Sequence, residues 1–462
     1  MPKVKILTTE ERHEAGKALR LKCPRTAHSD IILGQGDKRD IVAIIQDSNE
    51  GRLENLIPIR HGRMLQSPFA YFRGTAAIQA YDLAGTPTSG IIVQACGDCH
   101  LMNFGGFATP ERNIVFDIND FDETLPAPFE WDLKRLSASF VIAARFRGFK
   151  DDLAREIAVT VVKSYRESMR EREGSGVLEA WYARLSASEL PAMLHDDINL
   201  KARLKKKLAE GRRQTHEHVF NKLTTPSRGL PRILDQPPLI FHLDDPEVNE
   251  RSIAAFLKKY RDTLAEERRM LFDRFKFVDL ALKVVGVGSV GTRCLIALLL
   301  AAPDDPLFLQ IKEARRSVLE RHTGGKRLAH EGQRVVVGQR LMQSASDIFL
   351  GWSRGPRGRD FYVRQLRDMK IAPEVETQPP EMMLAYAKLC GMALARAHDK
   401  AGDAAMIAGY LGRTEQFDEA IGDYAVAYAD QVERDYQAFV KAVRSGRLKS
   451  DLSASRLATA IG

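Results

Sequence analysis

The pattern of apolar and polar residues predicts helices on both sides of one strand-rich segment. Apolar residues recur every three or four positions in several stretches, as they do on amphipathic helices. These stretches are residues 8–22, 132–147, 151–172, 176–187 and, as one long basic helix, 249–275. The helical pattern returns from Pro379 to the C-terminal end, with breaks near Gly402 and Gly412. Residues 223–238, rich in proline and threonine, predict an irregular connection.

The segment from Phe277 to Lys370 has a different pattern. Short apolar runs alternate there with turn residues, which is typical of strands. The predicted strands are residues 284–285, 294–300, 308–311, 348–352 and 361–366. A helical pattern over His330–Ser344 separates the third strand from the fourth. We therefore expect a small antiparallel sheet accompanied by one helix.

Two further short strands are predicted nearer the N-terminus, at Ile91–Ala95 and Arg112–Ile118. We expect them to form a hairpin-like unit with a polar loop at its mouth. The whole pattern predicts an α+β protein with four regions. They are residues 1–90 with an arginine- and aromatic-rich segment, 91–275 with the polar loop and a helical lobe, 276–372 with the sheet lobe, and 373–462 with helices that complete the helical lobe.

Composition favours an ordinary globular protein of 462 residues with a net charge of +8. No apolar run of about 18 residues is present, and residues 1–10 lack the apolar core of a secretory signal, so we expect a cytoplasmic protein without a membrane partner. Basic residues cluster in Lys201–Arg213 and Arg251–Lys276, but aromatic residues are not interleaved with them. A nucleic-acid-binding module therefore remains only an alternative, and no oligomeric state is predicted.

The five cysteines are too few, and odd in number, to predict a disulfide framework. Cys96 and Cys99 nevertheless match the C-x-x-C-H pattern of haem attachment and the C-x-x-C pattern of redox sites. A second C-x-x-C pair that could complete a zinc site is absent from the sequence. The simplest interpretation is that the two cysteines flank a functional Asp98.

A glycine-rich turn occupies Val285–Gly291. Its glycines, Gly286, Gly288 and Gly291, lie between two predicted strands, whereas the third glycine of a dinucleotide-binding motif opens a helix. A glycine hairpin between strands can cover the phosphates of a nucleotide and offer backbone N–H groups, with Ser289 beside them. The alternative is a purely structural turn.

Lys312 lies on the third predicted strand, 21 residues after Gly291. Strand alternation places Lys312 on the face of Gln310 and opposite Ile311. A lysine on a buried strand needs an anion to compensate its desolvation, and the α- and β-phosphates of ATP would supply one. The alternative is an edge-strand lysine that faces solvent.

The polar loop carries Asp98 and Asn103, five residues apart, and Asp117 ends the next predicted strand. Phosphoryl transfer needs a carboxylate near the attacking hydroxyl and oxygen ligands for Mg²⁺. Asp98 would orient or deprotonate the acceptor, while Asn103 and Asp117 would hold the metal. Either Asp120 or Asp122 could replace Asp117 as ligand. The alternative is a polar loop in which these residues serve turns and caps.

His100 has three possible roles: a general base, a metal ligand or, as we favour, a support that hydrogen-bonds loop carbonyls. Arg60, Arg63 and Arg73 could hold a phosphate or an acidic acceptor. Ordinary ion pairing is the alternative for these arginines.

The segment Gly97–Phe104 resembles the H-G-D-x-H-x-x-N catalytic loop of aminoglycoside and choline phosphotransferases, with Cys96 in place of the first histidine. Val115–Asp117 resembles the metal-binding segment of those enzymes, and Trp131–Leu133 resembles the start of the helix after it. Cys390–His398 resembles the helix that normally precedes the loop. Because the order of the two halves is reversed, the resemblance implies a circularly permuted, kinase-like fold with a small sheet lobe and a larger helical lobe.

In a kinase-like lobe, a glutamate from the following helix holds the strand lysine. Glu331 is the first candidate for the partner of Lys312, and Glu320 is the second. The resemblance implies an ATP- and Mg²⁺-dependent phosphotransferase that acts on a hydroxyl of a small molecule. A nucleotidyl transferase and an ATP-binding, pseudokinase-like sensor are the alternatives.

The chain as a whole also resembles a bacterial family known as domain of unknown function 2252, whose label carries no activity. The matching stretches are residues 67–74, 96–122, 287–293, 339–343 and 362–370.

Overall fold

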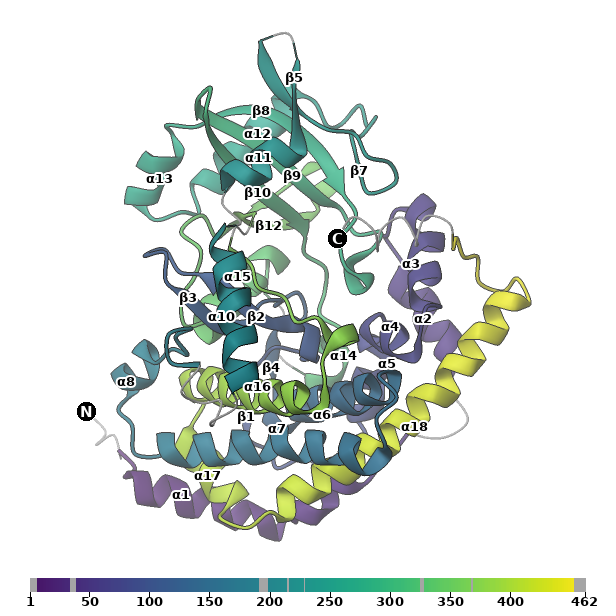
Figure 1. Cartoon of the computed structure of the whole chain (residues 1–462), viewed down its shortest axis with the longest axis vertical. Coiled ribbons are helices and arrows are strands. Elements are labelled where there is room, and N and C mark those ends of the chain that lie inside the picture. Colours follow the sequence, from purple (N-terminus) through teal and green to yellow (C-terminus); the bar gives the residue numbers. More distant parts are fainter. Residues whose placement is uncertain are drawn as a thin grey trace.

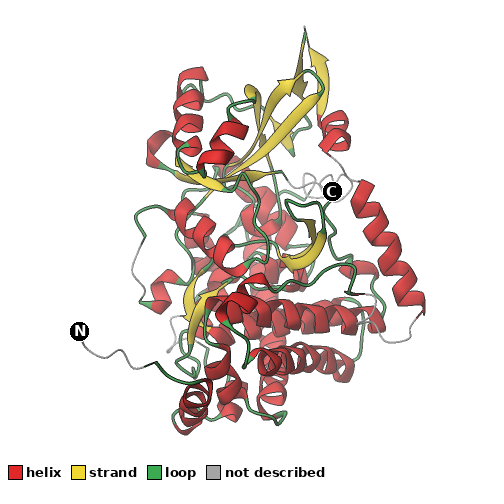
Figure 2. Cartoon of the chain, turned by 90° about the vertical axis from the view of Figure 1, so that its left-hand side faces the viewer, coloured by secondary structure: helices red, strands yellow, loops and turns green. Residues whose placement is uncertain are grey.

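The structure is a computed structural model that describes residues 6–33, 39–190, 198–213, 216–227, 229–324, 328–366 and 369–452. Most strands gather at one end of the molecule, and a helical body forms the other (Figures 1 and 2). The α+β class predicted from the sequence is confirmed. No helix in the described ranges is both long and apolar enough to cross a bilayer.

A six-stranded antiparallel sheet forms one lobe, with the strand order β11-β12-β10-β9-β8-β7. Its strands are β7 (Ile240–Phe241), β8 (Lys276–Lys283), β9 (Cys294–Ala302), β10 (Asp305–Glu313), β11 (Gly351–Arg354) and β12 (Asp360–Gln365). Helices α12 (Glu250–Arg261) and α15 (Glu331–Met342) pack against it.

Around β9 the sheet is apolar on both faces, which explains the continuous apolar run of this strand. Ile296 and Leu298 belong to one core cluster, and the alternating Ala297 and Leu299 belong to the cluster on the other face. A strand covered on both sides loses the alternating pattern of a half-exposed strand. Burial of each leucine contributes about 1.5–3 kcal/mol relative to exposure.

The helical lobe is built around α6 (Phe129–Phe146), which is buried from Phe129 to Ala144. Its main neighbours are α7 (Asp151–Arg172) and α18 (Gln416–Arg444), and α7 packs in turn on α16 (Pro380–Ala401). Several polar residues of α6 are buried with its apolar ones, among them Asp132 and Arg135. Such residues need partners in the interior, and those partners lie at the site described below.

The other α-helices in the described residues are α1 (Thr9–Ala18), α2 (Ile41–Asn49), α3 (Ile57–Met64), α4 (Pro68–Arg73), α5 (Ala76–Leu83), α8 (Val177–Tyr182), α10 (Ile198–Arg213), α11 (His216–Leu223), α13 (Glu266–Phe272), α14 (Glu320–Thr323) and α17 (Ala404–Leu411). The breaks expected near Gly402 and Gly412 separate α16, α17 and α18, so this prediction is confirmed.

The expected hairpin of residues 91–95 with 112–118 is wrong. Strand β1 (Ile92–Ala95) pairs with β4 (Leu125–Pro128), and β3 (Ile114–Ile118) pairs with β2 (Phe104–Ala108). The sequence pattern missed β2 because Gly105 and Gly106 interrupt its apolar run and weaken the strand signal. The polar loop therefore lies between β1 and β2, at the mouth of two small sheets.

Other predicted elements differ in extent. The strand expected at residues 284–285 lies earlier, because β8 ends at Lys283, and the strand expected at residues 348–352 is β11, which begins at Gly351. The long basic helix is two helices. The first ends at Arg261 and the second begins at Glu266, and Leu264 in the connection between them is buried in the core. The irregular connection contains the hairpin of β5 (Thr224–Ser227) and β6 (Leu230–Ile233). The helix expected over residues 176–187 ends at Tyr182.

Candidate active site

A polar cavity of about 350 Å³ lies where the two lobes meet. It collects most of the site residues predicted from sequence, although they come from two stretches that are far apart in the chain. The predicted residues that line it are Arg60, Arg73, Asp98, His100, Asn103, Asp120, Asp122, Gly286, Gly288, Ser289 and Lys312. Gly291, Arg63, Asp117, Glu320 and Glu331 are not among the residues that line it.

The glycine-rich turn lies between β8 and β9. Arg52 fixes its shape by donating hydrogen bonds to the carbonyls of Gly288 (2.9 Å) and Val290 (2.5 Å). Gly291 has a φ of +88°, which favours glycine, and its carbonyl accepts from the backbone N–H of Leu53 at 2.8 Å. Nothing local in the sequence identified Arg52, because its contacts with the turn lie more than 200 residues away.

Lys312 points from β10 into the cavity and is 3% exposed. Its ammonium lies 2.7 Å from Oδ2 of Asp122 and 3.7 Å from Oδ2 of Asp120. Burial alone would lower the pKa of Lys312, but the two carboxylates outweigh it and raise that pKa well above its usual value. The Tyr362 hydroxyl donates to the other oxygen of Asp122 at 2.6 Å, so Asp122 is held from two sides.

The expected glutamate partner of Lys312 is wrong. Glu331 accepts a hydrogen bond from Arg334 at 2.7 Å, and Glu320 pairs with Arg316 at 2.8 Å. The physical reason is that Arg334 lies one turn after Glu331 and binds it within the helix. Arg334 also donates to the backbone carbonyl of Asp122 at 2.8 Å, so α15 positions the partner of Lys312 indirectly.

The Asp98 loop is anchored to the start of α6. The carboxylate of Asp132 accepts from the backbone N–H groups of Cys96 (2.6 Å) and Gly97 (3.0 Å), and it lies 3.2 Å from Nε2 of His398 on α16. Gly97 has a φ of +87°, and a Cβ at this position would lie 2.3 Å from the carbonyl oxygen of Glu123. The turn therefore requires glycine.

Asp98 itself is held in place by Arg135 of α6, whose guanidinium contacts Oδ1 at 2.8 and 2.9 Å. The side-chain amide of Asn103 donates to the backbone carbonyl of Asp98 at 2.7 Å, which closes the loop. The carboxylate of Asp98 lines the cavity and keeps 19% of its side chain exposed. It is therefore oriented by protein contacts and still accessible to a ligand.

His100 lies beside Asp98, with 3.9 Å between its Nε2 and Oδ2 of Asp98. Burial lowers the pKa of His100 to about 3, so the ring is neutral near pH 7. Its Nδ1 is buried without a hydrogen-bond partner among the described residues. The expected contact with loop carbonyls is therefore not made through this nitrogen.

Asp117, expected as a metal ligand, lies outside the cavity and is fully buried. Its oxygens accept from Arg396 (2.6 Å) and from the backbone and hydroxyl of Ser344 (2.8 and 2.7 Å). These partners already satisfy the carboxylate. Of the acids considered as its replacement, Asp120 lines the cavity and keeps 34% of its side chain exposed.

The three predicted arginines differ in their availability. Arg63 does not line the cavity and donates to the carbonyl of Val285, and Arg60 donates to the carbonyl of Gly74 at 2.8 Å. Arg73 lines the cavity, forms no ion pair with the described residues, and has a buried Nε without a hydrogen-bond partner among them. Arg73 is therefore the arginine best placed to bind an anion.

Cys96 and Cys99 are buried free thiols. Contact with Cys99 lowers the pKa of Cys96, but burial outweighs it and raises that pKa to about 11. Burial also raises the pKa of Cys99 well above its usual value. Protonated thiols are weak nucleophiles and weak metal ligands, which disfavours the redox and zinc interpretations. Among the described residues, no group of three or more His, Cys, Asp or Glu side chains is arranged to hold a metal ion.

Glu123 lines the cavity and has a pKa above its usual value. Burial raises the pKa of Glu123 to about 7, although Arg334 and the backbone N–H of Val318 oppose the shift. The folded protein therefore binds a proton here between about pH 4.5 and 7 that the unfolded chain releases. Stability should fall as the pH rises through this window and then level off.

We expect Glu123→Gln to remove this part of the pH dependence, because a neutral amide carries no ionisation cost. The measurement is the melting temperature of both proteins from pH 5 to pH 9. The melting temperature of the variant should increase relative to that of the parent protein as the pH rises. A constant difference across the range would contradict the assignment.

Comparison with known proteins gives one match. A family model described as an uncharacterised protein conserved in bacteria matches residues 52–442, which include every residue that lines the cavity except Ser48. Comparison with curated proteins found no match, and comparison with solved structures found none.

Proposed function

Because the chain belongs to the bacterial family DUF2252, whose label names no activity, we propose a function from the geometry: an ATP- and Mg²⁺-dependent phosphotransferase that acts on a hydroxyl of a small molecule. One observation carries the proposal. A single cavity is lined by a glycine-rich turn and a buried lysine and, from about 190 residues earlier in the sequence, by an acidic loop. Phosphoryl transfer needs these three features around one triphosphate.

The residues present fit a nucleotide. The backbone of Gly286 and Gly288 leaves room for phosphates, and Lys312 supplies a positive charge at the back of the cavity. The Nε of Arg73 lacks a partner among the described residues, which supports an anionic ligand at the same place. A triphosphate would compete with Asp122 for Lys312.

The residues also fit Mg²⁺, which usually takes one or two carboxylates together with phosphate oxygens. Asp120 and Asn103 would hold the ion, with Asp122 beside them, and the ion would neutralise the charge of the phosphates. Lys312 and Arg364 outweigh the effect of burial and lower the pKa of Asp120, so its carboxylate is ionised and ready to bind a cation.

Asp98 would act on the acceptor. Its carboxylate, oriented by Arg135, would accept a hydrogen bond from the acceptor hydroxyl and take the proton as the new O–P bond forms. The bond between the γ-phosphorus and the bridging oxygen breaks, and ADP leaves. The products are a phosphorylated acceptor, ADP and a proton. The lowered pKa of His100 makes it a neutral neighbour rather than a proton donor.

Two helices support the kinase-like, permuted interpretation. Asp132 at the start of α6 and His398 near the end of α16 meet beside the Asp98 loop, 3.2 Å apart. These are the two segments that resemble the helices after and before the catalytic loop of aminoglycoside phosphotransferases. In this chain they are 266 residues apart.

The proposal is tested by a thermal-shift titration with ATP, ADP and Mg²⁺, followed by product analysis. At about 100 times its dissociation constant, ATP should stabilise the protein by roughly 2.7 kcal/mol. Mass spectrometry of products from a panel of hydroxyl compounds should show the addition of one phosphoryl group. A nucleotidyl adduct would identify the transferase alternative, and binding without turnover would favour the sensor. Absence of nucleotide binding would reject all three.

A further inference from the structure

The six-stranded sheet carries a second cavity, of about 100 Å³, on the face opposite the polar one. Strand β10 contributes to both, because Ile311 lines the second cavity whereas Gln310 and Lys312 line the first. The floor is apolar and includes Leu280, Leu295, Ala297 and Phe361. Helix α12 forms one wall with Ile253 and Phe256.

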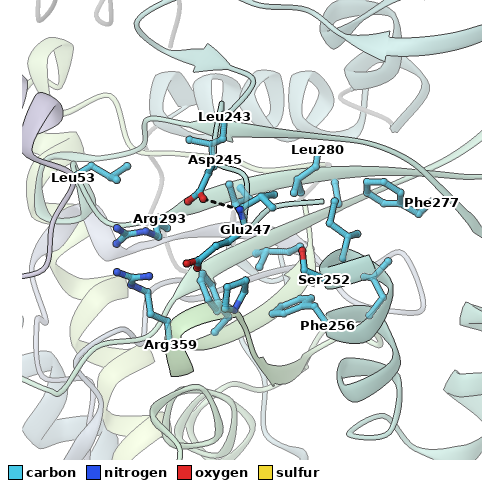
Figure 3. A pocket seen from close by; sticks show the side chains of 18 residues that line it. Leu53, Leu243, Asp245, Glu247, Ser252, Phe256, Phe277, Leu280, Arg293 and Arg359 are labelled. Carbon is cyan, nitrogen blue, oxygen red and sulfur yellow. Dashed lines mark hydrogen bonds between the residues drawn. The ribbon is translucent and has the colours of Figure 1, made fainter. Parts of the chain in front are cut away.

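Charged side chains gather at one end of this cavity, and apolar side chains fill the other end (Figure 3). Arg293 and Arg359 are on one side of the charged end. They share a single carboxylate, Glu313, at 3.2 and 3.6 Å. Two guanidinium groups with one carboxylate leave one positive charge in excess.

Asp245 and Glu247 are also at the charged end, close to the two arginines in the same view (Figure 3). They share a single cation, Arg357, at 3.7 and 2.8 Å. Two carboxylates with one guanidinium leave one negative charge in excess. The cavity therefore carries an excess positive charge on one side of its charged end and an excess negative charge on the other, beside an apolar chamber.

We propose that this cavity binds a free aliphatic α-amino acid. The ligand carboxylate would pair with Arg293 and Arg359, its ammonium with Asp245 and Glu247, and its side chain would occupy the apolar chamber. An apolar cavity of about 150 Å³ accommodates benzene, so the smaller chamber suits a branched aliphatic side chain better than an aromatic ring. The proposal concerns a site separate from the polar cavity and does not depend on the nucleotide.

The test is calorimetric titration of the whole chain with L-leucine. Each of three analogues lacks one recognised part: 4-methylpentanoate has no amine, 3-methylbutylamine has no carboxylate, and glycine has no side chain. We expect saturable binding of leucine and at least ten-fold weaker binding of each analogue, because each leaves a charge or the chamber unmatched. L-phenylalanine should also bind more weakly. No saturable binding of leucine, or equal binding of 4-methylpentanoate, overturns the proposal.

Two variants locate the site. Ile253→Trp fills the chamber and should abolish leucine binding, whereas Ala254→Trp adds the same ring to the exposed face of α12 and should leave it unchanged. Arg359→Gln changes only the charged end and covers the case in which Ile253→Trp fails to fold. This substitution should weaken the binding of leucine at least ten-fold and change the binding of 3-methylbutylamine little. Leucine binding that survives both Ile253→Trp and Arg359→Gln would overturn the assignment.

Discussion

Replacement of Asp98 with asparagine is expected to lower turnover by on the order of 10²-fold or more, while nucleotide affinity changes little. Asparagine keeps the size of the side chain and an oxygen for Arg135, so the loop should retain its shape. The amide cannot accept the proton of the acceptor hydroxyl. The measurement is steady-state phosphoryl transfer to whichever acceptor the product screen identifies, together with a nucleotide titration.

The matched control for this variant is Asp304→Asn, which makes the same chemical change in an exposed turn between β9 and β10. It should behave as the parent protein in both assays. If Asp98→Asn also retains full turnover, Asp98 has no role in the chemical step. If it loses nucleotide affinity and turnover together, Asp98 acts mainly in binding.

Replacement of Lys312 with methionine should have two separable effects. Loss of the ammonium should lower nucleotide affinity and turnover, again on the order of 10²-fold in turnover, because the phosphates lose their buried cation. It should also lower the free energy of unfolding by about 1–3 kcal/mol, because Asp120 and Asp122 lose their partner. The stability effect is smaller than for a fully buried pair, since these side chains remain 34% and 28% exposed.

A second substitution distinguishes the two effects. Lys312→Met combined with Asp122→Asn removes both charges of the closest pair and should regain part of the lost stability, but not the nucleotide affinity. Lys276→Met, on the exposed start of β8, is the matched control and should change neither quantity. Unaltered nucleotide affinity in Lys312→Met would contradict a phosphate-binding role.

Local sequence patterns were sufficient to locate the two halves of the site. The glycine spacing of Val285–Gly291 and the alternation around Lys312 are properties of a few neighbouring residues, and the structure brings both to the cavity. Asp98 and Asn103 also reach it, since a short loop keeps them together. The α+β class followed from the same local periodicity.

What the sequence did not predict depends on contacts across the chain. Arg135 orients Asp98 from a helix whose sequence pattern is that of an ordinary buried helix. Arg52 hydrogen-bonds the glycine-rich turn from over 200 residues away in the sequence. Asp117 was assigned to metal because it ends a predicted strand after the polar loop, but its carboxylate is satisfied by Arg396, 279 residues downstream. Glu331 was chosen by analogy with kinase lobes, yet the nearby Arg334 binds it first. The i,i+3 spacing of Glu331 and Arg334 is a local signal, whereas no local pattern encodes the contacts made by Arg135, Arg52 and Arg396.

The most direct test of the central claim is a structure of the whole chain with Mg²⁺ and a non-hydrolysable ATP analogue. The account predicts that the triphosphate lies beneath the Gly286–Ser289 turn, with Lys312 on its phosphates and the metal between them and Asp120. A nucleotide bound elsewhere, with the polar cavity empty, would contradict it.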